Sequence, residues 1–113
     1  MTNPEKIVQE QLDFYNNHDL EGFLSTYHDD IKLYNLIDNS LMLEGKEAMA
    51  ERYSNSFFNL NIHAELANRI IIGNQVIDHE KVTANNREGI SNAAAVYEVV
   101  DGLIKTVWFV RES

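Results

Sequence analysis

The feature that most constrains the fold is the stretch from Asn61 to Val82, which has the pattern of two long strands joined by a tight turn at Gly73-Asn74. Apolar β-branched residues alternate there with an unusual density of polar ones. The polar set is His63, Glu65, Asn68, Arg69, Asp78, His79 and Glu80. Polar side chains in the middle of long strands predict a curved sheet that walls a cavity.

The length of the turn decides which of these side chains face inward. A two-residue turn at Gly73-Asn74 places Arg69 opposite Asp78, whereas a three-residue turn places Arg69 opposite His79. A slip of one residue exchanges the two faces of a strand. The sequence therefore leaves open whether Asp78 and Glu80, or His79 alone, face the interior.

The remaining elements follow from apolar spacing and capping residues. Three helices are predicted: Pro4 to about Asn16 after the cap Asn3, Leu20 to Tyr27 after the cap Asp19, and about Lys46 to Phe58. The other predicted strands are Ile31 to Leu36, a short extended piece at Leu41 to Leu43, Asn92 to Val100 and Leu103 to Arg111. This order predicts an α+β architecture with helices on one face of an antiparallel sheet.

The last two strands meet at Asp101-Gly102, a two-residue turn of the primed type. Continued without interruption, this register places Glu98 opposite Lys105 on one face and Ala95 opposite Trp108 on the other. A small alanine facing a tryptophan is either large–small core packing or the floor of a cavity.

The face that carries Glu98 is then too apolar for open water. In the same register it also carries Val96, Val100, Val107 and Phe109. We expect a second copy of the chain to cover this outer sheet face, giving a homodimer.

Composition sets the broad class. At 113 residues the chain is expected to form one domain, residues 1–113. Its formal charge of −9 disfavours nucleic acid and anionic membrane surfaces as partners. It has no cysteine and no long apolar run, so we expect a cytoplasmic protein without thiol chemistry.

Four stretches carry a resemblance to a known family: Asn17 to Gly22, Tyr27 to Asp30, Glu51 to Ser56, and Tyr97 to Trp108. In this order and spacing the chain resembles the SnoaL-like and ketosteroid-isomerase-like branch of the nuclear transport factor two-like superfold. The resemblance implies a cone: a curved antiparallel sheet packed on three N-terminal helices, with a pocket for a small apolar or cyclic ligand and often a homodimer. It also implies isomerase-like proton transfer on a small cyclic carbonyl compound.

The standard isomerase residues are absent, however. Ketosteroid isomerases use an Asp base with a Tyr and a protonated Asp as oxyanion donors. The positions of this chain that resemble them are Asn35, Gln11 and Ala95, and only a supporting tyrosine, Tyr53, is kept. Asparagine cannot accept a proton at neutral pH.

Proton transfer in this chain therefore needs a different set of groups. Glu80 or Asp78 is the candidate base, with Tyr53 as the best candidate donor. The plainer alternatives are a solvated Glu80 and an Arg69–Asp78 ion pair on the solvent face. The candidate residues of the ligand pocket are Tyr15, Asn35, Asn68, His79, Tyr97 and Trp108.

No cofactor is implied, and no metal site is expected, because three well-aimed ligands cannot be assembled from His63, Glu65 and the Asp78–Glu80 run. Two classes of function stay open. The first is a small-molecule-binding cone domain with isomerase-like activity; the second is a non-catalytic ligand-binding or dimeric assembly module. A dehydratase-like enzyme would need a histidine and an aspartate paired inside.

Overall fold

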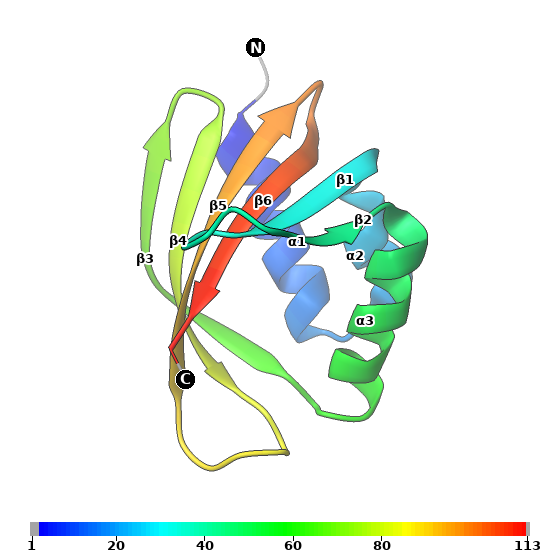
Figure 1. Ribbon diagram of the computed structural model, residues 1–113, viewed down its shortest axis with the longest axis vertical. Coiled ribbons are helices and arrows are strands. Elements are labelled where there is room, and N and C mark those ends of the chain that lie inside the picture. The colour runs from blue at the N-terminus through cyan, green and yellow to red at the C-terminus, as the bar shows by residue number, and fades with distance from the viewer. Residues whose placement is uncertain (1–2, 113) are drawn as a thin grey trace.

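The computed structural model describes residues 3–112 and has a curved six-stranded sheet with three helices packed on one face (Figure 1). The helices are α1 (Pro4–Asn16), α2 (Leu20–Ser25) and α3 (Lys46–Phe58). The strands are β1 (Tyr27–Asn35), β2 (Leu41–Glu44), β3 (His63–Ile72), β4 (Gln75–Thr83), β5 (Ser91–Val100) and β6 (Leu103–Arg111). This is the expected α+β cone.

The helix limits follow the predicted signals at most ends. The Asn3 side chain accepts a hydrogen bond from the backbone N–H of Glu5, with Pro4 as the first helical residue, and Asp19 caps α2 in the same way. The predicted end of the second helix is wrong: α2 stops at Ser25, and Tyr27 is the first residue of β1. The Tyr27 side chain is buried in the core, as the helical spacing also required.

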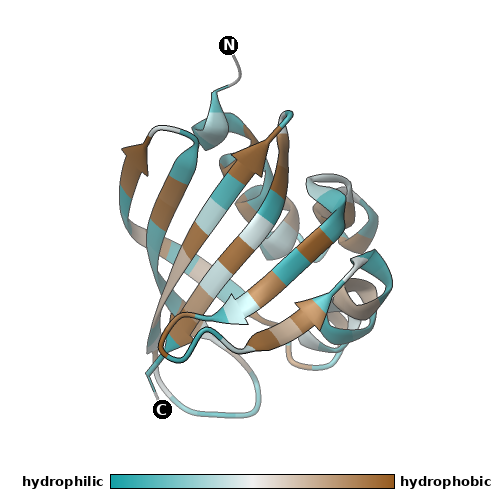
Figure 2. Ribbon diagram, turned by 45° about the horizontal axis from the view of Figure 1, so that its top comes forward, coloured by the Kyte–Doolittle hydropathy of each residue, from teal (hydrophilic) through white to brown (hydrophobic). Residues whose placement is uncertain are grey.

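The strands lie in the order β2-β1-β6-β5-β4-β3, and every neighbouring pair is antiparallel except β1 and β6. That parallel pair departs from a purely antiparallel sheet. It arises because the chain passes from β1 through β2 and α3 before it builds β3 to β6, so that the last strand returns beside the first. Residues along the strands alternate between apolar and polar (Figure 2), as one buried and one outer face require.

The long hairpin has the register of the two-residue turn, with Arg69 opposite Asp78. Ala67 then bulges out of β3, so Leu66 pairs with Glu80. The bulge keeps Leu66 and Arg69 on one face although they are three residues apart. Asp78 and Glu80 consequently both face inward.

The second hairpin departs from the expected register. Asp101 and Gly102 have φ angles of 53° and 81°, as a primed turn requires, and Val99 pairs with Ile104 as predicted. Lys105 is an extra residue in β6, which shifts all later pairs. The predicted partners Lys105 for Glu98 and Trp108 for Ala95 are therefore wrong.

The shift exchanges the faces of β6. Trp108 now pairs with Val96 on the outer face, whereas Val107 and Phe109 pair with Tyr97 and Ala95 on the inner face. Val107 and Phe109 were expected outside. The outer face therefore loses Val107 and Phe109, gains Trp108 and Val110, and keeps Val96 and Val100.

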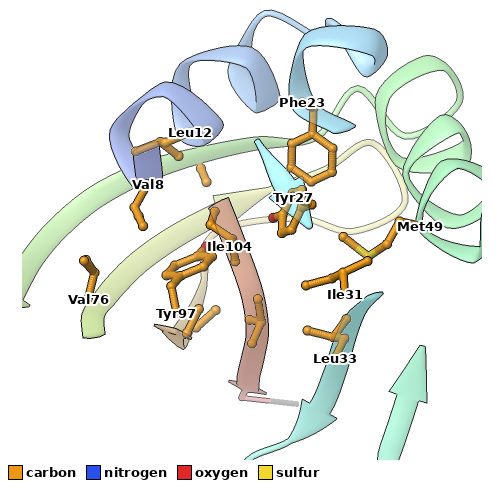
Figure 3. Close-up of a cluster of buried hydrophobic side chains, with 14 of the residues drawn as sticks. Val8, Leu12, Phe23, Tyr27, Ile31, Leu33, Met49, Val76, Tyr97 and Ile104 are labelled. Atoms are coloured by element: carbon orange, nitrogen blue, oxygen red, sulfur yellow. The ribbon is translucent and has the colours of Figure 1, made fainter. Parts of the chain in front are cut away.

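The core lies between the sheet and the helices (Figure 3). Val8 and Leu12 from α1, Phe23 from α2 and Met49 from α3 meet the inner face of the sheet there. A ring cluster closes the helical side, with Phe23 and Tyr53 centroids 4.8 Å apart. None of the helices formed by residues 3–112 is long and apolar enough to cross a membrane.

A buried ion pair ties the hairpin to the first helix. Arg69 Nε and Nη2 donate to the two carboxylate oxygens of Asp78 at 2.7 and 2.9 Å, and Nη1 donates to Gln9 of α1 at 2.9 Å. The Asp78 side chain is fully buried, and the Arg69 side chain is 8% exposed. The predicted Arg69–Asp78 pair is present, but it lies inside rather than on the solvent face.

Replacing Arg69 by Met should lower the free energy of unfolding by about 3 kcal/mol or more, because the Asp78 charge stays buried without a partner. Urea unfolding measures this change. The matched control is Lys32→Met, which removes the exposed Lys32–Glu44 pair and should cost less than about 1 kcal/mol. Equal losses in the two variants would show that the buried pair has no special role.

Candidate functional site

A cavity of about 70 Å³ lies between the inner face of the sheet, α1 and α3. Its wall combines apolar side chains with a carboxyl group, four tyrosines, a glutamine and two arginines. The lining residues are Gln11, Leu12, Tyr15, Tyr27, Leu33, Met49, Arg52, Tyr53, Ser56, Ile62, Glu80, Val82, Ala95, Tyr97, Val107, Phe109 and Arg111. An apolar cavity with a few convergent polar groups is the usual form of a small-molecule site.

Glu80 is the acidic side chain of this wall. The alternation of β4 brings it to the inner face, and its neighbours across the strands are Leu66 and the small Ala93. It is only 7% exposed, and no hydrogen bond to its carboxyl group occurs within residues 3–112. Burial, and then the charge of Asp78, raise its pKa to about 7, while Arg69 opposes this shift.

Tyrosine hydroxyl groups from four different elements surround the same space: Tyr15 of α1, Tyr27 of β1, Tyr53 of α3 and Tyr97 of β5. Tyr27 and Tyr97 lie between the sheet and the helices in Figure 3. Burial raises the pKa of all four above that of a free tyrosine, and the charge of Glu80 adds to the shift in each. They stay protonated at neutral pH and can donate hydrogen bonds.

Gln11 contributes a buried acceptor. Its side chain is 4% exposed, and its Oε1 atom has no hydrogen-bond partner among the described residues. A buried amide oxygen without a donor costs about 1–3 kcal/mol. A donor group in the cavity would satisfy it.

The predicted site residues separate into two groups. The cavity brings together Glu80, Tyr53, Tyr15 and Tyr97. Asp78 is buried beside them, but both of its oxygens are held by Arg69.

The other candidates lie elsewhere. His79 faces outward, with Nε2 2.8 Å from Asn92 Oδ1, and Asn68 is exposed after the bulge. Asn35 ends β1 and accepts a hydrogen bond from the backbone of Ile37. Trp108 stacks on Tyr34 on the outer face, because Lys105 shifts the register.

Sequence reasoning passed over Arg52, Ser56 and Arg111 as site residues. Arg52 and Ser56 lie at i+3 and i+7 from Met49, so the helical period places them on the inward face of α3. Arg111 shares the inner face with Val107 and Phe109, which only the Lys105 bulge reveals. Within residues 3–112 no three histidine or acidic side chains gather in a way that could hold a metal ion.

A family model described as a SnoaL-like domain matches residues 8–107. The chain belongs to the SnoaL-like domain family. No curated protein matches the chain in sequence.

Solved structures with this SnoaL-like fold are similar over nearly the whole chain. A cystatin-fold protein from Novosphingobium aromaticivorans is 24% identical, with a TM-score of 0.82, covering 98% of this chain and 99% of that one. An LEH-like epoxide hydrolase from M. tuberculosis is 16% identical, with a TM-score of 0.79 and coverage of 95% and 80%. A protein with a ketosteroid isomerase-like fold from Catenulispora acidiphila, in complex with trimethylamine, is 11% identical, with a TM-score of 0.77 and coverage of 97% and 86%. At these identities the likeness shows the fold alone.

Glu80 should make the stability of this SnoaL-like domain depend on pH. The native carboxyl, with a pKa of about 7, binds a proton more tightly than the unfolded one, with a pKa of 4.5. The native state therefore binds more protons between these values, and the free energy of unfolding falls as pH rises through them, by roughly 3 kcal/mol. Urea unfolding at about pH 5 and about pH 8 should show this fall in the wild type and a smaller one in Glu80→Gln.

The control for this measurement is Glu65→Gln, since Glu65 is an exposed glutamate of the same hairpin. Its free energy of unfolding should fall with rising pH as much as that of the wild type. If Glu80→Gln shows the same fall, Glu80 does not titrate in the raised range.

Proposed function

We propose that this SnoaL-like domain binds a small carbonyl compound and catalyses proton transfer on it, with Glu80 as the general base. The observation that carries the proposal is a buried carboxyl group that faces a cavity, has no hydrogen-bond partner and has a pKa of about 7. A base of this pKa is about half ionised at neutral pH, which suits both accepting and returning a proton.

The arrangement supports a two-step isomerisation. The Glu80 carboxylate takes a proton from the carbon next to the carbonyl group, and the electron pair moves to the carbonyl oxygen. The protonated Glu80 then returns the proton to a different carbon of the conjugated system, so no other reactant is needed. Tyr53 or Tyr97 donates a hydrogen bond to the oxygen as charge develops on it.

Asp78 takes part through its charge rather than as a second base. Its oxygens are occupied by Arg69, yet its negative charge lies two residues along β4 on the same face as Glu80. That charge helps to raise the pKa of Glu80. We therefore propose that the charge of Asp78 helps to set the pKa of Glu80.

The size of the cavity limits the substrate. About 70 Å³ is several-fold below the roughly 300–1,000 Å³ of a pocket for a drug-sized ligand. A small ring fits the enclosed space, whereas a steroid does not fit without displacing side chains such as Met49 or Phe109. The substitution of the usual catalytic positions by Asn35, Gln11 and Ala95 also argues against standard steroid isomerisation.

Replacing Glu80 by Gln should reduce isomerisation of a β,γ-unsaturated cyclic ketone such as cyclohex-3-enone about 100-fold or more, because the amide cannot accept a proton. Ultraviolet absorbance of the conjugated product measures the rate. The wild-type rate should rise with pH up to a plateau above about pH 7, as Glu80 becomes ionised.

Glu65→Gln again serves as the control and should keep the wild-type rate, since Glu65 is exposed and far from the cavity wall. An unchanged rate in Glu80→Gln would remove Glu80 from the mechanism. A thermal-shift screen of small cyclic ketones, lactones and steroids would identify better ligands, because saturating ligand stabilises the fold measurably.

A non-catalytic binding module is the second candidate. It is favoured by the aromatic cluster, in which the rings of Tyr15, Phe23, Tyr53 and Phe57 fill much of the space beneath the helices. In that case ligands bind in the thermal-shift screen, but neither wild type nor Glu80→Gln turns them over.

We further propose that the outer sheet face pairs with a second copy of the chain. Val96, Val100, Trp108 and Val110 form a half-buried apolar row on that face of β5 and β6. Large exposed apolar residues continue beside it near the β1–β2 turn, namely Leu36, Ile37, Leu41 and Met42. Such a surface is typical of protein–protein contact.

Val96→Asp should convert a dimer into a monomer, because it buries a charge at the proposed interface. Sedimentation velocity measures the change, and Asn59→Asp, at the exposed end of α3 on the helical side of the sheet, is the control. A wild-type chain that sediments as a monomer at all concentrations would rule out the pairing.

A further inference from the structure

Three of the four arginines of the chain gather beside the cavity, in a protein whose formal charge is −9. They line a hollow of about 230 Å³, which we call the arginine hollow. Its lining residues are Arg52, Asn55, Ser56, Leu60, Ile62, Ala84, Asn86, Arg87 and Arg111. None of these residues is acidic.

The three guanidinium groups have no carboxylate partner. Among the described residues, the ion pairs of the molecule include Arg69 but not Arg52, Arg87 or Arg111. The Nε and Nη2 atoms of Arg87 are buried and donate to no acceptor within residues 3–112. Buried charged donors normally have acceptors, so these two nitrogens are free to donate to an oxyanion.

The nearest acidic side chains are already engaged. Glu112 accepts hydrogen bonds from the backbone and side chain of Asn92, and Asp38, which lines a neighbouring hollow with Arg52 and Arg111, accepts from Ser40. Neither carboxylate forms an ion pair with the arginines, although the charge of Arg87 adds to the hydrogen bonds from Asn92 in lowering the pKa of Glu112. The positive charge therefore stays available to a ligand.

The arginine hollow and the cavity share a wall. Arg52, Ser56, Ile62 and Arg111 line both. The charges of Arg52 and Arg111 also reach the cavity, since they act against the raised pKa of Tyr15. A ligand group in the hollow thus lies next to the enclosed space that faces Glu80.

We propose that the arginine hollow binds a carboxylate group of the ligand, and that the ligand is a small oxo acid whose ring or carbonyl end enters the cavity. The carbonyl end of this assignment rests on the proposed function, whereas the carboxylate end rests only on the arginines. A planar carboxylate matches the paired N–H groups of a guanidinium. The strongly negative surface elsewhere repels the same anion, so the hollow is where it binds.

Binding of two matched probes tests this proposal: cyclopentanone bearing a carboxylate at the third ring carbon, and the corresponding carboxamide. They have nearly the same size and differ in charge. NMR titration should give the acid a dissociation constant about tenfold lower than that of the amide in the wild type. The ratio should fall toward one in Arg87→Gln/Arg111→Gln, and raised salt should weaken the acid alone.

Lys6→Gln/Lys81→Gln is the charge-matched control, since both lysines are exposed and neither lines the hollow, and it should keep the preference. Thermal unfolding verifies that each variant folds, and Arg87→Lys/Arg111→Lys, which keeps the charge but loses the paired donors, should give an intermediate ratio. Equal binding of acid and amide by the wild type overturns the proposal. So does a preference for the acid that survives in Arg87→Gln/Arg111→Gln.

Glu80→Gln separates this site from the proposed chemistry. This variant should still bind the acid more tightly than the amide, but it should lose isomerisation of cyclohex-3-enone. If the wild type prefers the acid but shows no turnover, the carboxylate site stands and the proposed catalysis fails; turnover of the neutral ketone without any preference for the acid gives the opposite result.

Discussion

The fold and the site both depend on the buried ion pair between Arg69 and Asp78. Its two hydrogen bonds join β3 to β4, and a third from Arg69 to Gln9 holds α1 against the hairpin. Arg69 directs its hydrogen bonds to Asp78 and Gln9 and donates none to Glu80, the next inward side chain of β4. The pair that fastens the helix to the sheet therefore also leaves one buried carboxyl group without a partner, and this is the group that gives the cavity its acid–base character.

Two single-residue bulges determine which other side chains face the cavity together with Glu80. Ala67 in β3 brings Leu66 to the same inner face as Arg69, and Lys105 in β6 turns Phe109 and Arg111 inward and Trp108 outward. A bulge bends its strand and increases the local twist, so the same two residues contribute to the curvature that opens space beneath the helices. The same two bulges therefore affect both the curvature of the sheet and the identity of the residues that line the cavity.

The sequence predicted the elements far better than the faces. Helix caps at Asn3 and Asp19, the Asp101-Gly102 turn and the apolar spacing are local signals, and each specifies its element without knowledge of the rest. The bulges have no comparable local signal, because Ala67 and Lys105 are ordinary strand residues whose exclusion depends on packing across the sheet. Glu80, Tyr53, Tyr15 and Tyr97 were expected at the pocket and do line the cavity, whereas Trp108, which was also expected there, lies beyond the Lys105 bulge on the outer face. Arg52 could have been recognised from the helical period of α3, whereas Arg111 could not.

The polar groups around the cavity are not those that stability alone would select. A glutamate with its carboxyl buried, a glutamine oxygen without a donor and two unpartnered guanidinium nitrogens on Arg87 each lower the free energy of unfolding relative to apolar or paired groups. The same chain gives each guanidinium nitrogen of Arg69 an acceptor, so its architecture is able to pair buried charges. The unpaired groups cluster at one cavity and its neighbouring hollow, with a carboxyl group at one end and guanidinium groups at the other. A ligand carboxylate would satisfy the guanidinium groups, and an N–H or O–H donor on the same ligand would satisfy the oxygen of Gln11. The cost of leaving these groups unpaired in the free protein then becomes part of the affinity and selectivity for that ligand.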